Sequence, residues 1–235
     1  GFGSDCGFIK FCDIVCRQVP EIKPDCAVIV CTIRALKEHG GASGGGEDLK
    51  ALEKGCENLA KHIEIVHKYG IPAVVAINRF TTDTDREIKL VREKALEAGA
   101  DEVAVAEAWA KGGEGCQELA DKVLEVLKRP ARFRLLYPDN ATIEEKIEII
   151  ATEIYGAKDV EFSPEAKKKI EFYTSLGYDK FPINMAKTQY SLSHNPQWKG
   201  VPKNYTLPVD DLLAFVGAGF ITAICGKMQL MPGLP

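Results

Sequence analysis

Several common functional signatures are absent from this 235-residue sequence. It has no G-x-x-x-x-G-K-[ST] motif, so the chain carries no phosphate-binding loop of its own. None of its eight cysteines forms a C-x-x-C pair, which argues against a zinc ribbon or a thioredoxin-like redox site. We expect no metal site and reduced cysteines that pack as small hydrophobic residues. The longest apolar stretch, 212–225, is shorter than the roughly 18 residues that a membrane-spanning helix needs.

A strong charge of either sign is also absent. The formal net charge is -4, which gives no overall attraction to nucleic acid or to an anionic membrane. We therefore expect neither as a partner, and we expect a cytoplasmic protein. The sequence starts at Gly1 without a methionine and ends at Pro235 in a short Pro-Gly-Leu-Pro stretch. We interpret it as a piece of a longer protein.

Residues 1–130 alternate between short apolar runs and amphipathic segments. The apolar runs predict strands, which we expect to be buried, and the spacing of three and four residues between leucines, isoleucines and valines predicts helices. Strands are expected at 27–32, 71–78 and 101–106, and helices are expected to begin near Leu49, Thr84 and Gly115. This β-α-β-α-β-α order predicts an α/β fold, with a parallel sheet like that of P-loop nucleotide-binding proteins.

Residues 131–235 follow a different pattern, which predicts a smaller mixed α/β portion. A capping box at 142–145 and a Ser-Pro pair at 163–164 predict two helix starts. Strands are expected at 132–137, 181–187 and 212–224, the last with two glycines inside it. A polar loop over 188–207 lies between the last two strands, and loops of that length are usually functional or disordered.

The first candidate site follows the strand at 71–78. Asn78 can donate to and accept from the edge of a purine or pterin, and Phe80 can stack on such a ring. Ligands of open α/β sheets bind at the carboxyl ends of strands. The alternative is structural, with Asn78 capping a turn and Phe80 in the core.

A second candidate lies about thirty residues later, where Trp109, Lys111 and Gly113 precede a helix. The backbone N–H groups at the start of a helix suit an anion, and Lys111 adds positive charge. Together with Phe80, these residues predict a cradle for a flat, negatively charged heterocycle. A tryptophan packed in the core is the alternative.

A third candidate is Lys187 with Gln189, in a polar cluster at the end of the expected strand 181–187. These side chains could hold a polar substrate. His194 lies nearby, but a lone histidine in a loop is more often a surface residue than a catalytic one.

Seven ordered motifs resemble formate–tetrahydrofolate ligase, also called formyltetrahydrofolate synthetase, along essentially the whole chain. The resemblance covers only the later part of that family, whose members are more than twice as long. The motifs are Arg34-Ala-Leu-Lys-Glu-His-Gly-Gly41, Ala76-Ile-Asn-Arg-Phe-Thr-Thr-Asp-Thr84, Trp109-Ala-Lys-Gly-Gly-Glu-Gly115, Ala151-Thr-Glu-Ile-Tyr-Gly156, Met185-Ala-Lys-Thr-Gln-Tyr190, Gly217-Ala-Gly-Phe220 and Met231-Pro-Gly-Leu-Pro235.

The resemblance implies an enzyme that uses ATP to join formate to tetrahydrofolate through formyl phosphate, giving 10-formyltetrahydrofolate. It implies that Phe80 and Trp109 clamp a flat ring, pterin or adenine, with Asn78, Lys111 and Gly113 beside it. It places the phosphate loop, which holds ATP and Mg²⁺, in an N-terminal part that precedes this chain. The piece alone should then be nearly inactive, and the family suggests a homotetramer.

Two other functions stay open at this point. The chain could be a binding module for folate or a nucleotide that has no ligase activity. It could also be a structural fragment without a ligand. No catalytic residue is assigned by the sequence.

Overall fold

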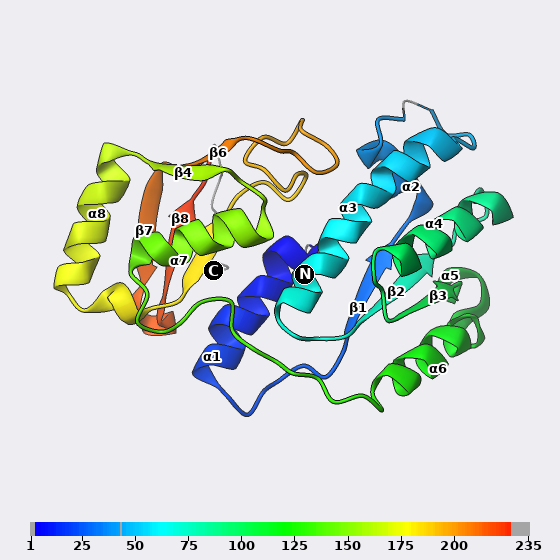
Figure 1. Cartoon of the computed structure of the whole chain (residues 1–235), viewed down its shortest axis with the longest axis horizontal. Helices are drawn as coiled ribbons and strands as arrows, with labels where there is room; N and C mark the ends of the chain where they lie inside the picture. The colour runs from blue at the N-terminus through cyan, green and yellow to red at the C-terminus, as the bar shows by residue number, and fades with distance from the viewer. Residues whose placement is uncertain (1–2, 43, 227–235) are drawn as a thin grey trace. The chain divides into compact units, whose positions relative to one another are not determined.

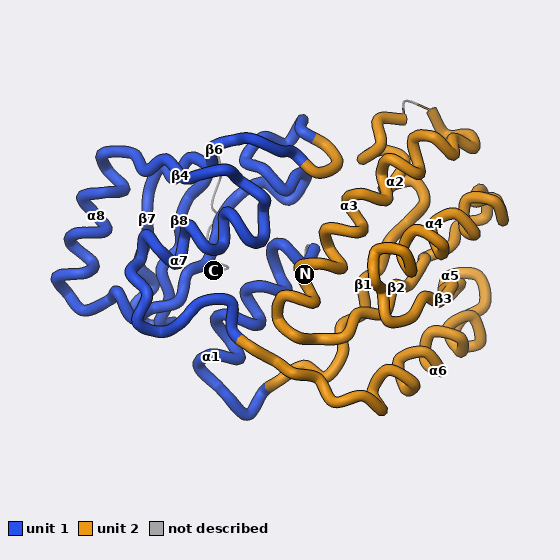
Figure 2. The backbone as a smooth tube through the Cα atoms, viewed as in Figure 1, with its two compact units in different colours: residues 1–22, 135–198, 202–235 blue, residues 23–134, 199–201 orange. Residues whose placement is uncertain are grey.

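The computed structural model of this chain describes residues 3–42 and 44–226 (Figure 1). No helix in this part of the chain is long and apolar enough to cross a membrane. The chain forms two compact units (Figure 2). Unit 1 contains Gly1–Ile22, Leu135–Trp198 and Pro202–Pro235, and unit 2 contains Lys23–Arg134 and Lys199–Val201. The division into portions 1–130 and 131–235 stays a prediction.

Unit 2 is an α/β layer structure around a three-stranded parallel sheet. Its strand order is β1-β2-β3, with Ala27 opposite Ala73 and Val74 opposite Glu102. The predicted α/β class with a parallel sheet is confirmed. The elements are β1 (Ala27–Cys31), α2 (Ile33–His39), α3 (Leu49–Lys68), β2 (Ala73–Asn78), α4 (Asp85–Glu97), β3 (Glu102–Ala106), α5 (Ala108–Lys111), a 3₁₀ turn (Gly112–Cys116) and α6 (Gln117–Val126).

The core of unit 2 lies around β2. The neighbouring residues Val74 and Val75 both have no exposed surface, so both faces of this strand are covered. Helices α3 and α4 pack on each other and near β2, while α6 packs on β2 and β3. The expectation of a fully buried strand at 27–32 is wrong. Val28 and Val30 lie on one face of β1 and are 43% and 64% exposed, so that face of the strand is not covered.

Helices α2 and α3 approach each other through glycine. A Cβ atom on Gly55 would lie 1.8 Å from the carbonyl oxygen of Leu36, so any larger residue there would push the two helices apart. Next to this crossing, Lys37 donates to Glu87 Oε1 at 2.8 Å in an ion pair whose carboxylate has no exposed surface. Glu87 also closes a capping box with Thr84, so α4 begins where the sequence predicts a helix start.

Unit 1 combines a mixed sheet, a two-stranded parallel sheet and several helices. Strand β5 runs parallel to β8, β7 runs antiparallel to β8, and β4 pairs with β6 in parallel. The elements are two π-helical segments (Gly3–Phe8, Phe11–Val15), α1 (Cys16–Gln18), α7 (Ile143–Ile149), a π turn (Ile150–Ile154), β4 (Asp159–Phe162), α8 (Pro164–Ser175), a 3₁₀ turn (Tyr178–Lys180), β5 (Ile183–Ala186), β6 (Thr206–Val209), β7 (Asp211–Phe215), a 3₁₀ turn (Val216–Ala218) and β8 (Phe220–Ile224).

The N-terminal helical segment is anchored inside unit 1. Arg17 lies 4.4 Å from the centre of the Tyr137 ring and donates to the Tyr137 carbonyl at 2.8 Å. Asp13 accepts from the Leu136 backbone N–H at 3.2 Å. The Tyr137 hydroxyl accepts from the Ile183 N–H at 3.0 Å, which continues the contact to the start of β5.

Two expected strands are wrong. No strand forms at 132–137, because the backbone N–H groups of Arg132 and Arg134 donate to Gly70 and Tyr69, just beyond the end of α3. The expected strand at 212–224 is a hairpin of β7 and β8. Gly219 adopts a left-handed φ of 69° at its turn, where its N–H donates to the Phe215 carbonyl. The 231–235 motif lies outside the described residues.

Candidate functional site

The end of β2 presents Phe80 at the surface. Asn78 is the last residue of the strand, and the Arg79 N–H still donates to the Ala106 carbonyl of β3 at 3.0 Å. The chain then turns, because Asp83 accepts from the Phe80 N–H at 2.8 Å and its own N–H donates back to the Phe80 carbonyl at 3.0 Å. This closed turn leaves the Phe80 side chain 46% exposed and leads directly into α4.

The end of β3 presents Trp109 in a similar way. Glu107 follows the strand and starts α5, and its N–H donates to the Gly115 carbonyl at 2.9 Å. Lys111 Nζ lies 2.6 Å from Glu107 Oε2, which ties one turn of α5 together. Trp109 is 86% exposed, so it does not pack in the core of unit 2. Gly113 lies in the exposed 3₁₀ turn that follows.

These two strand ends form one cavity in unit 2. Its volume is about 300 Å³, and it is lined by Arg79, Phe80, Thr81, Glu107, Trp109 and Ala110. The two aromatic residues that the sequence singled out therefore share a cavity at the carboxyl edge of the parallel sheet, as expected for this fold. Asn78, Lys111 and Gly113 are near it in the sequence but are not among its lining residues.

The cavity has a balanced charge. The Arg79 guanidinium is 2.8 Å from Asp85 Oδ1, and the Glu107 carboxylate is paired with Lys111. Glu107 also lines the cavity and was not predicted, although it follows the strand at 101–106 much as Phe80 follows the strand at 71–78. Two exposed aromatic side chains with polar groups around them suit a flat ring with hydrogen-bonding edges.

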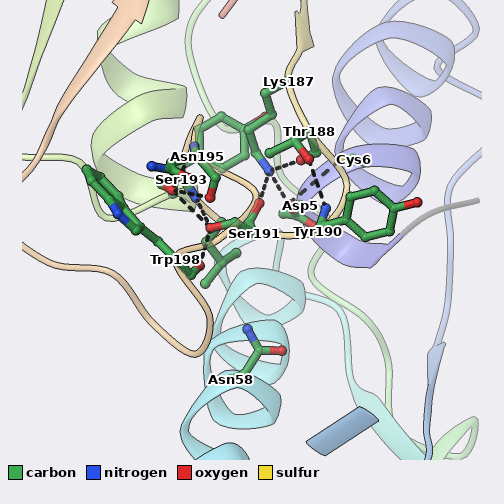
Figure 3. A network of polar contacts seen from close by, with 12 residues as sticks. Asp5, Cys6, Asn58, Lys187, Thr188, Tyr190, Ser191, Ser193, Asn195 and Trp198 are labelled. Atoms are coloured by element: carbon green, nitrogen blue, oxygen red, sulfur yellow. Dashed lines mark hydrogen bonds and ion pairs between the residues drawn. The ribbon is translucent and has the colours of Figure 1, made fainter. Parts of the chain in front are cut away.

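Lys187 belongs to unit 1 and is buried. Its ammonium group donates to Asp5 Oδ2 at 2.8 Å, to the Thr188 carbonyl at 3.1 Å and to the Ser191 carbonyl at 2.6 Å (Figure 3). An ammonium has three N–H donors, and all three have acceptors in this network. Gln189 lies in the turn above it and is exposed. No pattern near Lys187 indicates Asp5, which lies 182 positions away.

Tyr155 forms one wall of this network. The Lys187 ammonium lies 4.8 Å from the centre of its ring, within the range of a cation–π contact. The Tyr155 hydroxyl has no hydrogen-bond partner among the described residues, and burial raises the pKa of Tyr155 well above its usual value. The ring therefore contacts the lysine as a neutral aromatic group, and it adds no negative charge to the site.

A second polar contact holds the segment 199–201 on unit 2. The Gly200 N–H donates to His39 Nδ1 at 3.1 Å, and Asn58 donates to the Gly200 carbonyl at 2.9 Å. Gly200 has a φ of 72°, which favours glycine there. His39 follows the Arg-Ala-Leu-Lys motif, and its ring nitrogen here accepts from the backbone. His194, expected at the surface, has a buried Nδ1 without a hydrogen-bond partner among the described residues.

Comparison with known proteins relates the whole chain to one family. Residues 1–235 match the family described as formate–tetrahydrofolate ligase. The chain is 53% identical over 245 residues to a formate–tetrahydrofolate ligase of Desulforamulus reducens, matching all of this chain and 43% of that protein. It is 48% identical to a cytoplasmic C-1-tetrahydrofolate synthase of Spodoptera frugiperda and 47% identical to one of Schizosaccharomyces pombe. The match covers all of this chain and 26% of each synthase, so the chain spans less than half of these relatives.

Proposed function

Because the chain belongs to the formate–tetrahydrofolate ligase family, we propose that it is one part of an enzyme that uses ATP to join formate to tetrahydrofolate and so makes 10-formyltetrahydrofolate. Its own contribution is the aromatic cavity of unit 2, which binds the flat ring of a substrate. The observation that carries this role is that Phe80 and Trp109 line one cavity while Trp109 is 86% exposed.

Exposed aromatic surface is unfavourable, because its apolar area lies in water. An aromatic side chain can bury about 150–250 Å², and stacking adds to that gain. Trp109 has most of its surface in water, so a ring that enters between it and Phe80 removes apolar area from water on two sides. Asn78, Lys111 and Gly113 lie outside the lining of the cavity, so they would contact parts of the substrate that extend beyond the ring between Phe80 and Trp109.

We propose that Lys187 and Gln189, which both belong to unit 1, contribute to substrate binding in different ways. All three N–H donors of Lys187 are engaged inside the unit, whereas Gln189 is exposed. Gln189 would therefore make the direct contact, and Lys187 would support the turn that carries it. The geometry favours a role in binding and orientation, and positioning is a large part of catalysis in reactions that join two substrates.

ATP and Mg²⁺ enter this proposal as a substrate and a cofactor of the whole enzyme. The sequence has no phosphate-binding loop, and residues 3–42 and 44–226 contain no cluster of three His, Cys, Asp or Glu side chains placed to hold a metal. Neither observation points to a magnesium–phosphate site among these residues. We therefore assign the phosphates and the metal to no residue of this chain, and we place them in the upstream part of the longer enzyme.

The assembly and the location of the enzyme are also part of the proposal. We infer a cytoplasmic homo-oligomer, with a tetramer as the expected state. Two relatives carry the word cytoplasmic in their names. Light scattering after size-exclusion chromatography of the full-length enzyme would give the mass of the assembly, and a monomeric mass would contradict this inference.

Calorimetric titration of the chain tests the cavity. Tetrahydrofolate should bind to the unmodified chain, and Phe80→Ala should weaken binding by about tenfold, or roughly 1.4 kcal/mol. The matched control is Phe172→Ala, because Phe172 is an aromatic residue of unit 1 that is 57% exposed. Equal losses in both variants, or no binding to a folded chain, would contradict the proposal.

A competition experiment distinguishes the two candidate rings. If the cavity binds the pterin, tetrahydrofolate should bind equally well with and without ATP. If it binds adenine, ATP should bind in the absence of tetrahydrofolate, and Phe80→Ala should weaken the binding of ATP. Binding of either ligand without a reaction in the full-length enzyme would favour a binding module over a ligase.

A further inference from the structure

The 188–191 turn of unit 1 is built around a buried positive charge. Lys187 follows β5 directly, and its side chain has no exposed surface. Two of its three hydrogen bonds go to carbonyl groups of the turn, those of Thr188 and Ser191. Because the chain wraps around the ammonium group in this way, Gln189 and Tyr190 lie at the exposed tip of the turn.

The turn is continued by a chain of serine hydroxyls. The Ser191 hydroxyl donates to the Trp198 carbonyl at 2.6 Å and accepts from the Ser193 N–H at 3.0 Å. The Ser193 hydroxyl in turn accepts from the Asn195 N–H at 3.1 Å (Figure 3). Both serines are buried, so these bonds lie in a region of low dielectric, where a broken bond is costly.

Asp5 supplies the charge that makes this arrangement possible. Burying an ammonium group without a counterion is unfavourable, because only a well-placed opposite charge compensates for the loss of its hydration. The carbonyl groups of Thr188 and Ser191 are dipoles and carry no net charge, whereas the Asp5 side chain is a carboxylate that is only 9% exposed. It comes from the helical segment Gly3–Phe8, so a contact distant in sequence controls a local turn.

We propose that Asp5 is a positioning residue that acts through Lys187 to fix the 188–191 turn and so holds Gln189 in the conformation that binds substrate. This inference rests on the proposed function only for its last step. The first step, control of the turn by Asp5, concerns the conformation of unit 1 and can be measured without a ligand.

Hydrogen exchange tests the first step in the chain carrying Asp5→Asn. The amides of Tyr190, Ser193 and Asn195, which donate to side chains of the turn network, should exchange at least tenfold faster, while amides in α8 should stay unchanged. The matched control is Asp139→Asn, because Asp139 also pairs with a basic residue of unit 1, Arg17, but has an 82% exposed side chain. Unchanged exchange at the turn in Asp5→Asn would overturn the proposal.

If Asp5→Asn does not fold, the double variant Asp5→Asn/Lys187→Met replaces it. This variant removes both charges together and leaves no unpaired buried ion. It should show the same fast exchange at the turn, because the donor that holds the two carbonyl groups is gone. A turn that stays protected in a folded double variant would overturn the proposal.

Binding of tetrahydrofolate tests the second step. Asp5→Asn and Gln189→Ala should each weaken binding by about fivefold, and the two together should weaken it no more than Gln189→Ala alone, because both act on one contact. Losses that multiply would show that Asp5 acts elsewhere and would overturn the proposal. If the unmodified chain does not bind tetrahydrofolate, the proposed function fails, whereas the exchange experiment still decides whether Asp5 controls the turn.

Discussion

The aromatic cavity of unit 2 and the lysine network of unit 1 place their key side chains in opposite surroundings. Trp109 is apolar and 86% exposed, whereas Lys187 is charged and its side chain is fully buried. Each arrangement is unfavourable unless something compensates for it. For Lys187 the compensation is internal, from Asp5 and two carbonyl groups. For Trp109 we propose that the compensation is a ligand.

This difference separates binding residues from residues that support them. An exposed aromatic side chain contributes little to the stability of the unbound chain, and its largest free-energy gain comes when a ring covers it. A buried ion pair contributes to the conformation of the chain at all times. Substitutions in the two regions should therefore differ in their largest effect, which is on affinity in the aromatic cavity and on stability in the lysine network.

The largest expected effect is on stability in unit 1. Lys187→Met leaves the Asp5 carboxylate buried without its partner, and breaking a buried pair in this way costs about 3–5 kcal/mol. The free energy of unfolding, measured with urea, should fall by that amount. A fall below about 1 kcal/mol, as for a surface pair, would remove the contrast between the two regions.

The second effect is on affinity in unit 2. Trp109→Ala should weaken tetrahydrofolate binding by about 1–3 kcal/mol, the range found when an aromatic partner of a stacked base is removed. Its stability should change by less than about 0.5 kcal/mol, since the side chain is exposed. A loss of stability without a change in affinity would show that Trp109 supports the fold and does not bind the ring.

The third effect is the pH dependence of stability that arises from the second buried lysine pair, Lys37 with Glu87. Burial alone would raise the pKa of Glu87, but hydrogen bonds from Lys37 and from the Thr84 backbone, together with the Lys37 charge, lower it. A carboxylate whose pKa is lower in the folded state stabilises the protein above its unfolded pKa of about 4.3, and this stability is lost as pH falls through the folded value.

Urea unfolding at several pH values should therefore show that the contribution of Glu87 to the free energy of unfolding is constant above about pH 5 and declines below it. The full decline is about 1.4 kcal/mol for each unit of difference between the folded and the unfolded pKa. Glu87→Gln should be less stable at neutral pH and should reduce the acid-dependent decline. A variant with the same decline as the unmodified chain would show that Glu87 does not produce it.

The smallest effect is expected at the edge of the cavity. Lys111→Ala removes an exposed pair with Glu107, which is worth less than about 1 kcal/mol of stability. Affinity for tetrahydrofolate should fall slightly, and the fall should shrink as salt is added, because exposed charges are screened. A large loss of affinity that does not depend on salt would show that Lys111 contacts the ligand directly.

Local signals explain why several helix starts in both units, and the strand ends of unit 2, could be predicted. The capping boxes at Thr84 and Thr142 and the Ser163 cap lie where the sequence placed helix starts, because these patterns satisfy backbone groups within four residues. The strand ends at Asn78 and Ala106 followed from apolar runs, and a parallel sheet then brings their following residues together.

The elements and contacts that were predicted wrongly or missed depend on residues that are distant in the sequence. The segment 132–137 has apolar and basic residues suited to a strand, but its N–H groups find acceptors at the end of α3. The partner of Lys187 could not be predicted, since nothing near it in the sequence indicates a carboxylate 182 residues away. Strands β4 and β6 were missed, because they are short and form only with each other.

The central claim is that Phe80 and Trp109 bind one ring between them, and Trp109 fluorescence tests it most directly. The chain has two tryptophans, so Trp198→Phe makes Trp109 the single emitter, and free tryptophan titrated in parallel corrects for absorption by tetrahydrofolate. Tetrahydrofolate should change this emission in a saturable way, and Phe80→Ala should shift the saturation to higher concentration. A folded chain whose Trp109 emission does not respond to tetrahydrofolate or to ATP would contradict the claim.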